Sequence, residues 1–126
     1  MYRKHNKVII IQRGKKRTLE ALLKEHQSYL DGKSKKKVNF KGADLHDVDL
    51  SGLDLSGINF EGANLSGSNL SNCNLSNANM NDTDCSNVDF SYSNMTNTDT
   101  CNMKLIGCCI TGIKRQRWTS KKKYYC

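Results

Sequence analysis

The chain has 126 residues, enough for one domain with tails, and its 37 % hydrophobic content is too low to fill a conventional globular core easily. Its charge is divided among three segments: residues 1–37 carry 12 Lys and Arg against 3 Asp and Glu, residues 38–112 carry 2 against 9, and residues 113–126 carry 6 against none. The expected domains are therefore a basic N-terminal segment of charge +9, a middle segment of charge −7 and a C-terminal tail of charge +6, which together give the net +8.

The N-terminal segment is expected to form a short strand followed by a helix. The apolar residues within 7–12 predict a strand that packs on the helix or on the segment after it, and an interaction site is the alternative. Thr18 is a suitable N-cap for a helix that ends near Leu30. Five residues lie near one face of that helix: Leu19, Leu22, Leu23, His26 and Leu30. Asp31 and Gly32 then supply a helix stop.

Residues 38–112 contain an internal repeat of five residues. The centre of nearly every repeat is apolar, in the series Phe40, Leu45, Leu50, Leu55, Phe60, Leu65, Leu70, Leu75, Met80, Cys85, Phe90, Met95, Thr100, Leu105 and Ile110. The residue two before the centre is small or apolar, and Asn or Asp stands immediately before every centre from Phe40 to Thr100. Ser usually follows the centre, and Gly or Asn commonly comes next.

A period of five residues suits neither an α-helix nor a straight strand. Five residues advance a helix by about 500°, so the apolar stripe would rotate by roughly 140° at each repeat. On a strand, an odd period sends successive centres to opposite faces. The pattern is consistent only if the chain turns a corner every five residues, with Ser, Asn, Asp and Gly at the turns. The sequence therefore predicts an all-β solenoid.

The repeats, in runs such as Ala-Asp-Leu-His-Asp at 43–47 and Ala-Asn-Leu-Ser-Gly at 63–67, resemble the pentapeptide-repeat family over 75 residues and fifteen consecutive repeats. The resemblance implies a right-handed quadrilateral β-helix with four repeats per coil, and hence just under four coils. Residues 19–32 also resemble a helical leader of phage and bacterial members of the family. This likeness implies that the helix caps the open end of the solenoid, where the core and the backbone edge would otherwise be bare.

With twenty residues per coil, centres that are twenty residues apart should stack into four inward columns. The columns are Phe40, Phe60, Met80 and Thr100; Leu45, Leu65, Cys85 and Leu105; Leu50, Leu70, Phe90 and Ile110; and Leu55, Leu75 and Met95. We expect the last coil to be less regular, because Thr100 occupies a centre and Lys104 and Cys109 replace the usual Asn or Asp.

Basic residues at both ends of the chain are the candidate contacts for nucleic acid or for an acidic partner. The tail combines them with Trp118, and basic and aromatic side chains together bind single-stranded nucleic acid by phosphate contact and base stacking. The alternative is that Trp118 covers the last coil while the lysines are solvated. The candidates are Arg13, Lys15, Lys16, Arg17, Lys35, Lys36, Lys37, Lys114, Arg115, Arg117, Trp118, Lys121, Lys122 and Lys123.

The repeats also supply a candidate acidic interaction face, which consists of Asp44, Asp47, Asp49, Asp54, Glu61, Asp84 and Asp89. Some family members, notably the quinolone-resistance proteins, use an acidic rod to imitate duplex DNA, so the resemblance raises DNA mimicry as a hypothesis. Three features disfavour it: the short rod, the lack of a recognisable C-terminal dimer helix, and the basic ends that oppose the acidic field. The alternative is that Asn and Asp serve the geometry of the turns.

We expect no catalytic, cofactor-binding or metal site. The three histidines lie in different segments with no obvious nucleophile beside them, and no Cys-x-x-Cys pair exists. Cys73, Cys85 and Cys108 fall at inward positions, whereas Cys101 and Cys109 are expected to face outward. No apolar run is long enough for a secretory signal or a membrane span, so we expect a protein of the bacterial cytoplasm with reduced thiols and no membrane contact.

Three functions remain open from the sequence. The favoured hypothesis is a non-enzymatic protein-interaction module, in one version phage-encoded, that binds or inhibits a host protein that handles nucleic acid. The second is a protein that binds nucleic acid through its basic ends, and the third is a structural subunit of a larger assembly. The oligomeric state does not follow from the sequence, and the functions of a fold cannot be transferred by analogy alone.

Overall fold

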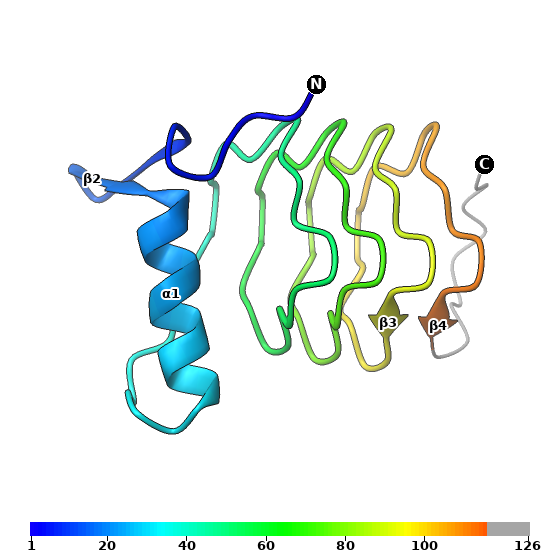
Figure 1. Ribbon diagram of the computed structural model, residues 1–126. Helices are drawn as coiled ribbons and strands as arrows, with labels where there is room; N and C mark the ends of the chain where they lie inside the picture. The colour runs from blue at the N-terminus through cyan, green and yellow to red at the C-terminus, as the bar shows by residue number, and fades with distance from the viewer. Residues whose placement is uncertain (116–126) are drawn as a thin grey trace.

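The computed structural model describes residues 1–115, which form a stack of rectangular coils with a hairpin and a helix beside its first coil (Figure 1). The elements in chain order are β1 (Ile9–Gln12), β2 (Lys15–Thr18), α1 (Leu19–Leu30), β3 (Asn94–Met95) and β4 (Lys114–Arg115). The two strands of the hairpin and α1 lie at one end of the stack, and β4 lies at the other end. No helix within residues 1–115 is long and apolar enough to cross a membrane.

An antiparallel hairpin precedes the helix. Strand β1 pairs with β2, and the two-residue loop of Arg13 and Gly14 has φ values of 50° and 75°, as hairpin turns with two left-handed residues require. The strand expected within 7–12 is confirmed, whereas β2 was not predicted. Of the apolar side chains of this segment, Val8 and Ile10 are buried, but Ile9 and Ile11 are 49 % and 63 % exposed. The prediction that this apolar run packs inward therefore holds for only half of it.

Helix α1 has the bounds that its cap residues predict. The hydroxyl of Thr18 accepts a hydrogen bond from the N–H of Ala21 at 3.1 Å, and Thr18 is the N-cap. At the other end, the N–H of Asp31 donates to the carbonyl of Gln27, and Gly32 follows with φ 74°. Three side chains of the helix are buried, namely Leu19, Leu22 and His26.

The coils are held together by a parallel ladder with a register of twenty residues. Residues at equivalent positions pair from coil to coil, as Asn39↔Asn59, Asp44↔Asn64, Asp49↔Asn69 and Asp54↔Asn74 show for the four sides. In the last three of these pairs the hydrogen bonds run both ways, for example from Leu45 N–H to Asn64 O at 2.7 Å and from Asn64 N–H to Ala43 O at 2.9 Å. Each coil therefore contains four repeats.

Regular strands are few in this solenoid because the corners interrupt each side. Within the coils, only β3 and β4 extend over two paired residues, and the other pairings are single bridges. The residues at the corners have positive φ values, from 52° at Asp47 to 75° at Gly107, and this favours Gly and Asn there. The all-β expectation is thus realised as a ladder between short extended segments rather than as a conventional sheet.

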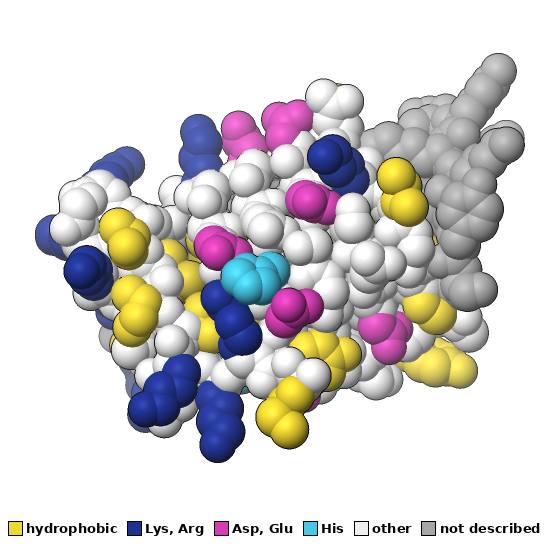
Figure 2. Space-filling model, turned by 90° about the horizontal axis from the view of Figure 1, so that it is seen from above, with side chains coloured by type: hydrophobic (Ala, Val, Ile, Leu, Met, Phe, Trp, Pro, Cys, Tyr) yellow, Lys and Arg dark blue, Asp and Glu magenta, His cyan; other side chains and the backbone are white. Residues whose placement is uncertain are grey.

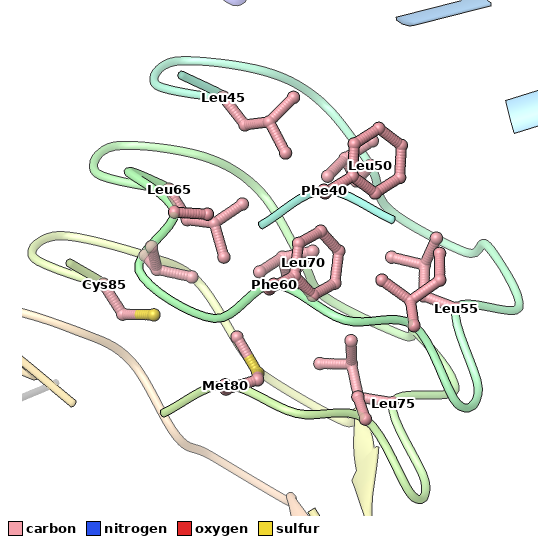
Figure 3. Close-up of a cluster of buried hydrophobic side chains, with 14 of the residues drawn as sticks. Phe40, Leu45, Leu50, Leu55, Phe60, Leu65, Leu70, Leu75, Met80 and Cys85 are labelled. Carbon is pink, nitrogen blue, oxygen red and sulfur yellow. The ribbon is translucent and has the colours of Figure 1, made fainter. Parts of the chain in front are cut away.

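The centres of the repeats point into the solenoid and stack in columns (Figure 3). Every centre from Phe40 to Met95 is buried, and the rings of Phe40 and Phe60 stack with their centroids 5.6 Å apart. Cys73, Cys85 and Cys108 are buried as predicted, whereas Cys101 is exposed and Cys109 is half-buried. Thr100 and Ile110 are only half-buried, so the core weakens in the last coil although the ladder continues through Cys109.

Candidate interaction site

The seven carboxylates of the candidate acidic face lie on all four sides of the solenoid. Because stacked positions are twenty residues apart, Asp44, Asp47 and Asp84 share one side, and Asp49 and Asp89 share the next. Asp54 and Glu61 lie on the two remaining sides. The structure therefore does not bring the whole set together on a single face.

The Asn and Asp residues that precede the centres make local turn contacts. The Oδ1 atom of Asp49 accepts the N–H of Ser51 at 3.0 Å, and Asp84 and Asp89 each accept both the N–H and the hydroxyl of the serine two residues later. Hydrogen bonding from Ser51 lowers the pKa of Asp49, and hydrogen bonding from Ser86 lowers the pKa of Asp84. These contacts account for the Asn or Asp at this position by turn geometry.

The basic residues of the N-terminal segment line a groove of about 660 Å³ between the hairpin, α1 and the start of the first coil. Six of its lining residues are cationic: Arg13, Lys15, Arg17, Lys36, Lys37 and Lys41. Five of these were candidates from the sequence, whereas Lys41 was missed and the candidates Lys16 and Lys35 do not line the groove. Figure 2 shows that Lys and Arg gather mainly at the hairpin end, whereas most of the visible Asp and Glu lie along the coils.

Ion pairs neutralise only part of this basic lining. Glu25, the single Asp or Glu of the lining, lies 2.6 Å from Arg17 and 3.7 Å from Lys36. Lys41 lies 3.8 Å from Glu61. Among residues 1–115, no carboxylate forms an ion pair with the remaining three cations, Arg13, Lys15 and Lys37. The groove therefore has an excess of positive charge, which favours an anionic occupant.

Apolar side chains form part of the same lining. Ile10, Leu22 and Val38 belong to the lining but are almost fully buried, whereas Ile11 is 63 % exposed. The sequence signal that could have located the groove is the Arg13–Gly14 pair. It indicates a hairpin turn between two segments that are each long enough to form a strand.

Side chains from residues 1–26 hydrogen bond to the exposed backbone edge of the first coil. In later coils, the carbonyl of each Asn or Asp before a centre accepts an N–H from the preceding coil, which the first coil lacks. On three sides a side chain takes that place: Arg3 donates to Asp44 O at 3.2 Å, His5 contacts Asp49 O, and His26 contacts Asp54 O at 3.0 Å. On the fourth side, Gln12 donates to Lys41 O at 3.2 Å.

His26 is a buried, neutral member of this set. Desolvation by burial lowers its pKa, although the hydrogen bond and the charge of Asp54 oppose the shift. Because its partner is a carbonyl oxygen, Nε2 must carry the proton and donate. His26 therefore acts as a hydrogen-bond donor to the first coil, and its Nδ1 atom is the site that an added proton would occupy.

The other features of the chain offer little chemistry. Within residues 1–115, no group of three His, Cys, Asp or Glu side chains could hold a metal ion. Burial raises the pKa of Cys73 to about 11, which keeps this thiol protonated and unreactive at neutral pH. Lys114 and Arg115 are exposed on β4. The remaining tail candidates lie outside the described residues, namely Arg117, Trp118, Lys121, Lys122 and Lys123.

Three solved structures resemble this chain. A pentapeptide repeat protein from the Arabidopsis thaliana thylakoid lumen is 27 % identical, with a TM-score of 0.59 over 61 % of this chain and 54 % of its own. HetL from the cyanobacterium Nostoc, involved in heterocyst differentiation regulation, is 20 % identical, with a TM-score of 0.45 over 61 % and 39 %. Another Nostoc pentapeptide repeat protein is 18 % identical, with a TM-score of 0.42 over 78 % and 95 %.

This chain spans about half of the length of the Arabidopsis protein and less of HetL. No curated protein matches it in sequence. The family model described as pentapeptide repeats matches residues 36–62, 43–82, 68–99 and 83–114, with 8 copies. That match extends over more than half of the chain, and the twenty-residue ladder supports it independently. The chain thus belongs to the pentapeptide-repeat family, whose fold is a right-handed quadrilateral β-helix.

Proposed function

We propose that this chain is a non-enzymatic interaction module that holds an acidic segment of a partner protein in its N-terminal basic groove. Pentapeptide-repeat proteins are generally non-enzymatic structural or interaction modules. The observation that carries the proposal is the groove itself, because six cations and a single carboxylate line it. Within residues 1–115, Arg13, Lys15 and Lys37 form no ion pair, although Lys37 lies over the ring of Tyr29 at 5.8 Å, and all three can pair with carboxylates of a partner.

In this proposal residues 1–30 also cap a rod of just under four coils. The cap covers the core with the hairpin and α1. It also occupies part of the backbone edge of the first coil, through Arg3, His5 and His26 on three sides and through Gln12 at Lys41 O on the fourth. Cover of this kind over most of the edge opposes the addition of further coils. The rod would then hold the groove in a fixed shape, because the segment of residues 36–41 leads directly into the first coil.

A second candidate function is nucleic-acid binding through the same cations. The observation in its favour is the excess of positive charge, which phosphate groups also neutralise. The acidic candidate face has less support, because its carboxylates lie on four sides and several serve the turns. A DNA-mimic role would have to use the side that carries Asp44, Asp47 and Asp84. In each version we expect the protein to act in the cytoplasm of a bacterial cell. A phage gene is a possible source of the protein.

The test compares two double variants with the same change of charge. Lys15→Gln with Lys37→Gln neutralises two cations of the groove, and Lys16→Gln with Lys35→Gln neutralises two neighbouring exposed lysines outside it. Each full-length protein is immobilised and exposed to a bacterial lysate with and without nuclease. We expect a protein that survives nuclease to be retained by the wild type and by the control variant, and to be lost from the groove variant.

Two other outcomes would contradict the proposal. Equal retention by both double variants would show that the groove is not the contact site. Loss of all bound material after nuclease would favour the nucleic-acid alternative instead. Both variants should keep the far-ultraviolet circular dichroism of the wild type, since none of the four lysines forms an ion pair within residues 1–115.

A further inference from the structure

We infer that the basic groove receives its acidic partner as an extended strand, which adds to the open backbone edge of the first coil at Asn39. This inference rests on the proposed function and specifies the form of the partner: an extended peptide with alternating acidic and apolar residues. It follows from three observations, which are the unmatched edge on one side of the first coil, the two-sided character of the groove, and the distribution of its charges.

The open edge lies on the side of the first coil that contains Asn39. In the following coils, Asn59 O accepts the N–H of Phe40 at 2.8 Å, and Asn79 donates its N–H to Ile58 O at 2.9 Å. Asn39 occupies the equivalent register position, as its pairing with Asn59 shows, but no coil precedes it. Within residues 1–115, neither its N–H nor its carbonyl has a backbone partner.

The other three sides show that this opening is specific. There the equivalent carbonyls of Asp44, Asp49 and Asp54 contact Arg3, His5 and His26. On the fourth side, the side chain of Gln12 reaches Lys41 O, two residues further along, and leaves the backbone of Asn39 unmatched. Asn39 is exposed and lines the basic groove, so the open edge and the excess of cations coincide.

The groove also suits the two faces of a strand. Side chains alternate between the faces of an extended chain, so an added strand can direct one set toward the exposed Ile11 of the lining and the other toward the cations. Its volume of about 660 Å³ is within the ordinary range of ligand sites. Addition of a strand to a free edge supplies affinity through main-chain hydrogen bonds and specificity through alternate side chains.

The same features disfavour nucleic acid and a helical partner. The sugar-phosphate backbone of a nucleic acid has no N–H donor with which to match the carbonyl of Asn39. A helix has already used its backbone groups internally. An extended peptide is the occupant that can use both the open edge and the charge of the groove.

The test uses a fluorescein-labelled octapeptide of alternating glutamate and valine, with binding to the full chain followed by fluorescence anisotropy. Two further peptides carry N-methyl groups on either the odd or the even amides, so that each blocks the donors of one strand edge and leaves the charge unchanged. We expect the parent peptide to bind, and at least one methylated isomer to bind at least ten-fold more weakly. The Lys15→Gln, Lys37→Gln variant should bind the parent about ten-fold more weakly, and the Lys16→Gln, Lys35→Gln control within two-fold of the wild type.

The possible failures of the two proposals are distinguishable. If both methylated isomers bind as tightly as the parent, while the groove variant still weakens binding, strand addition is overturned and the acidic-partner groove remains. If the two double variants bind the parent equally, the groove proposal fails together with the strand. Tighter binding of a single-stranded octathymidylate than of the parent peptide would overturn both in favour of nucleic acid.

Discussion

The Asn or Asp before each centre is the residue on which the geometry of a repeat most directly depends. At Asn69, the Oδ1 atom accepts the N–H of Ser71 at 2.9 Å and the hydroxyl of Ser71 at 2.6 Å. Only an oxygen on a short side chain can reach both donors, which explains why Asn and Asp alternate freely at this position. The negative charge of the Asp residues is therefore a by-product of the turn at several positions.

Substitution of Asn69 separates turn geometry from charge. Asn69→Ala removes the acceptor for Ser71 and should lower the free energy of unfolding by about 1 kcal/mol. Asn69→Asp keeps the acceptor, and at high ionic strength, which screens repulsion from the paired Asp49 and Asp89, it should change that free energy by less than about 0.5 kcal/mol. Urea denaturation of both variants measures the difference. If Asn69→Ala proves as stable as the wild type, the turn contact contributes nothing and the repeated Asn needs another explanation.

His26 should make stability depend on pH near neutrality. Burial holds its pKa in the folded state below the ordinary value of 6.5, so the unfolded chain takes up a proton at a pH where the folded chain does not. The unfolded state then binds more protons than the folded state. His26 therefore contributes fully to the free energy of unfolding above pH 6.5, and this contribution is lost as the pH falls through 6.5 toward the pKa of the folded state. The urea concentration at the midpoint of unfolding should therefore decrease when the pH is lowered from about 7.5 to about 5.5.

Two variants isolate this effect. His26→Gln removes the titrating ring, and most of the change in midpoint between pH 7.5 and pH 5.5 should disappear with it. His46→Gln, which changes a half-buried histidine on the first coil, leaves His26 in place and should keep its contribution. Wild-type midpoints that are constant over this range would show that folding does not depress the pKa of His26.

At the scale of elements, the sequence predicted the structure correctly where the structure depends on interactions between residues close in the chain. The repeat predicted inward centres at Leu45 and Leu65, and Thr18 and Gly32 predicted the ends of α1, because turns and caps depend on nearby backbone. Strand β2 was missed because its Lys-Lys-Arg-Thr sequence has no apolar alternation. It forms because the Arg13–Gly14 turn returns the chain beside β1.

The candidate site could be predicted only in part for the same reason. The basic character of residues 13–17 and 35–37 was visible in the sequence, but the register of the hairpin decides that Lys15 lines the groove and Lys16 does not. Lys41 belongs to the repeat tract, and only the fold brings it opposite the hairpin. The acidic set shows the converse, because residues similar in sequence are separated onto four sides by the corners.

The N-terminal segment should limit self-association through its contacts with the first coil. Deletion of residues 1–7 removes the contacts of Arg3 with Asp44 O and of His5 with Asp49 O. Two sides of the first coil then lose their cover, in addition to the side that is open at Asn39. Because unpaired strand edges pair with other chains, we expect concentration-dependent dimers in light scattering after size-exclusion chromatography. The double variant Arg3→Lys, His5→Gln keeps a donor at each position and serves as the control. Identical behaviour of the deletion and the control would contradict a capping role for these contacts.

At the scale of the whole molecule, the solenoid has contacts only between neighbouring coils. Each inner coil hydrogen bonds to the coil before it and the coil after it, and the centres stack within the same columns. Stability in such a chain is approximately a sum of the contributions of the coils and of the interfaces between them. The half-buried Thr100 and Ile110 therefore weaken the last coil locally, while the fully buried Leu65 and Leu70 stabilise the middle of the rod.

Hydrogen exchange should reveal this gradient. The amide of Leu65, bonded to Asp84 O at 2.9 Å, should exchange only on global unfolding, whereas those of Lys104 and Cys109 should exchange roughly 10 to 100 times faster through opening of the last coil. Leu65→Ala should reduce protection throughout, because it removes about 2–5 kcal/mol from the centre of the rod. Ile110→Ala should accelerate exchange at Cys109 and leave Leu65 almost unchanged. Equal acceleration at both amides would show that the rod opens as a single unit, in which case the weak core of the last coil would be supported by the coils before it.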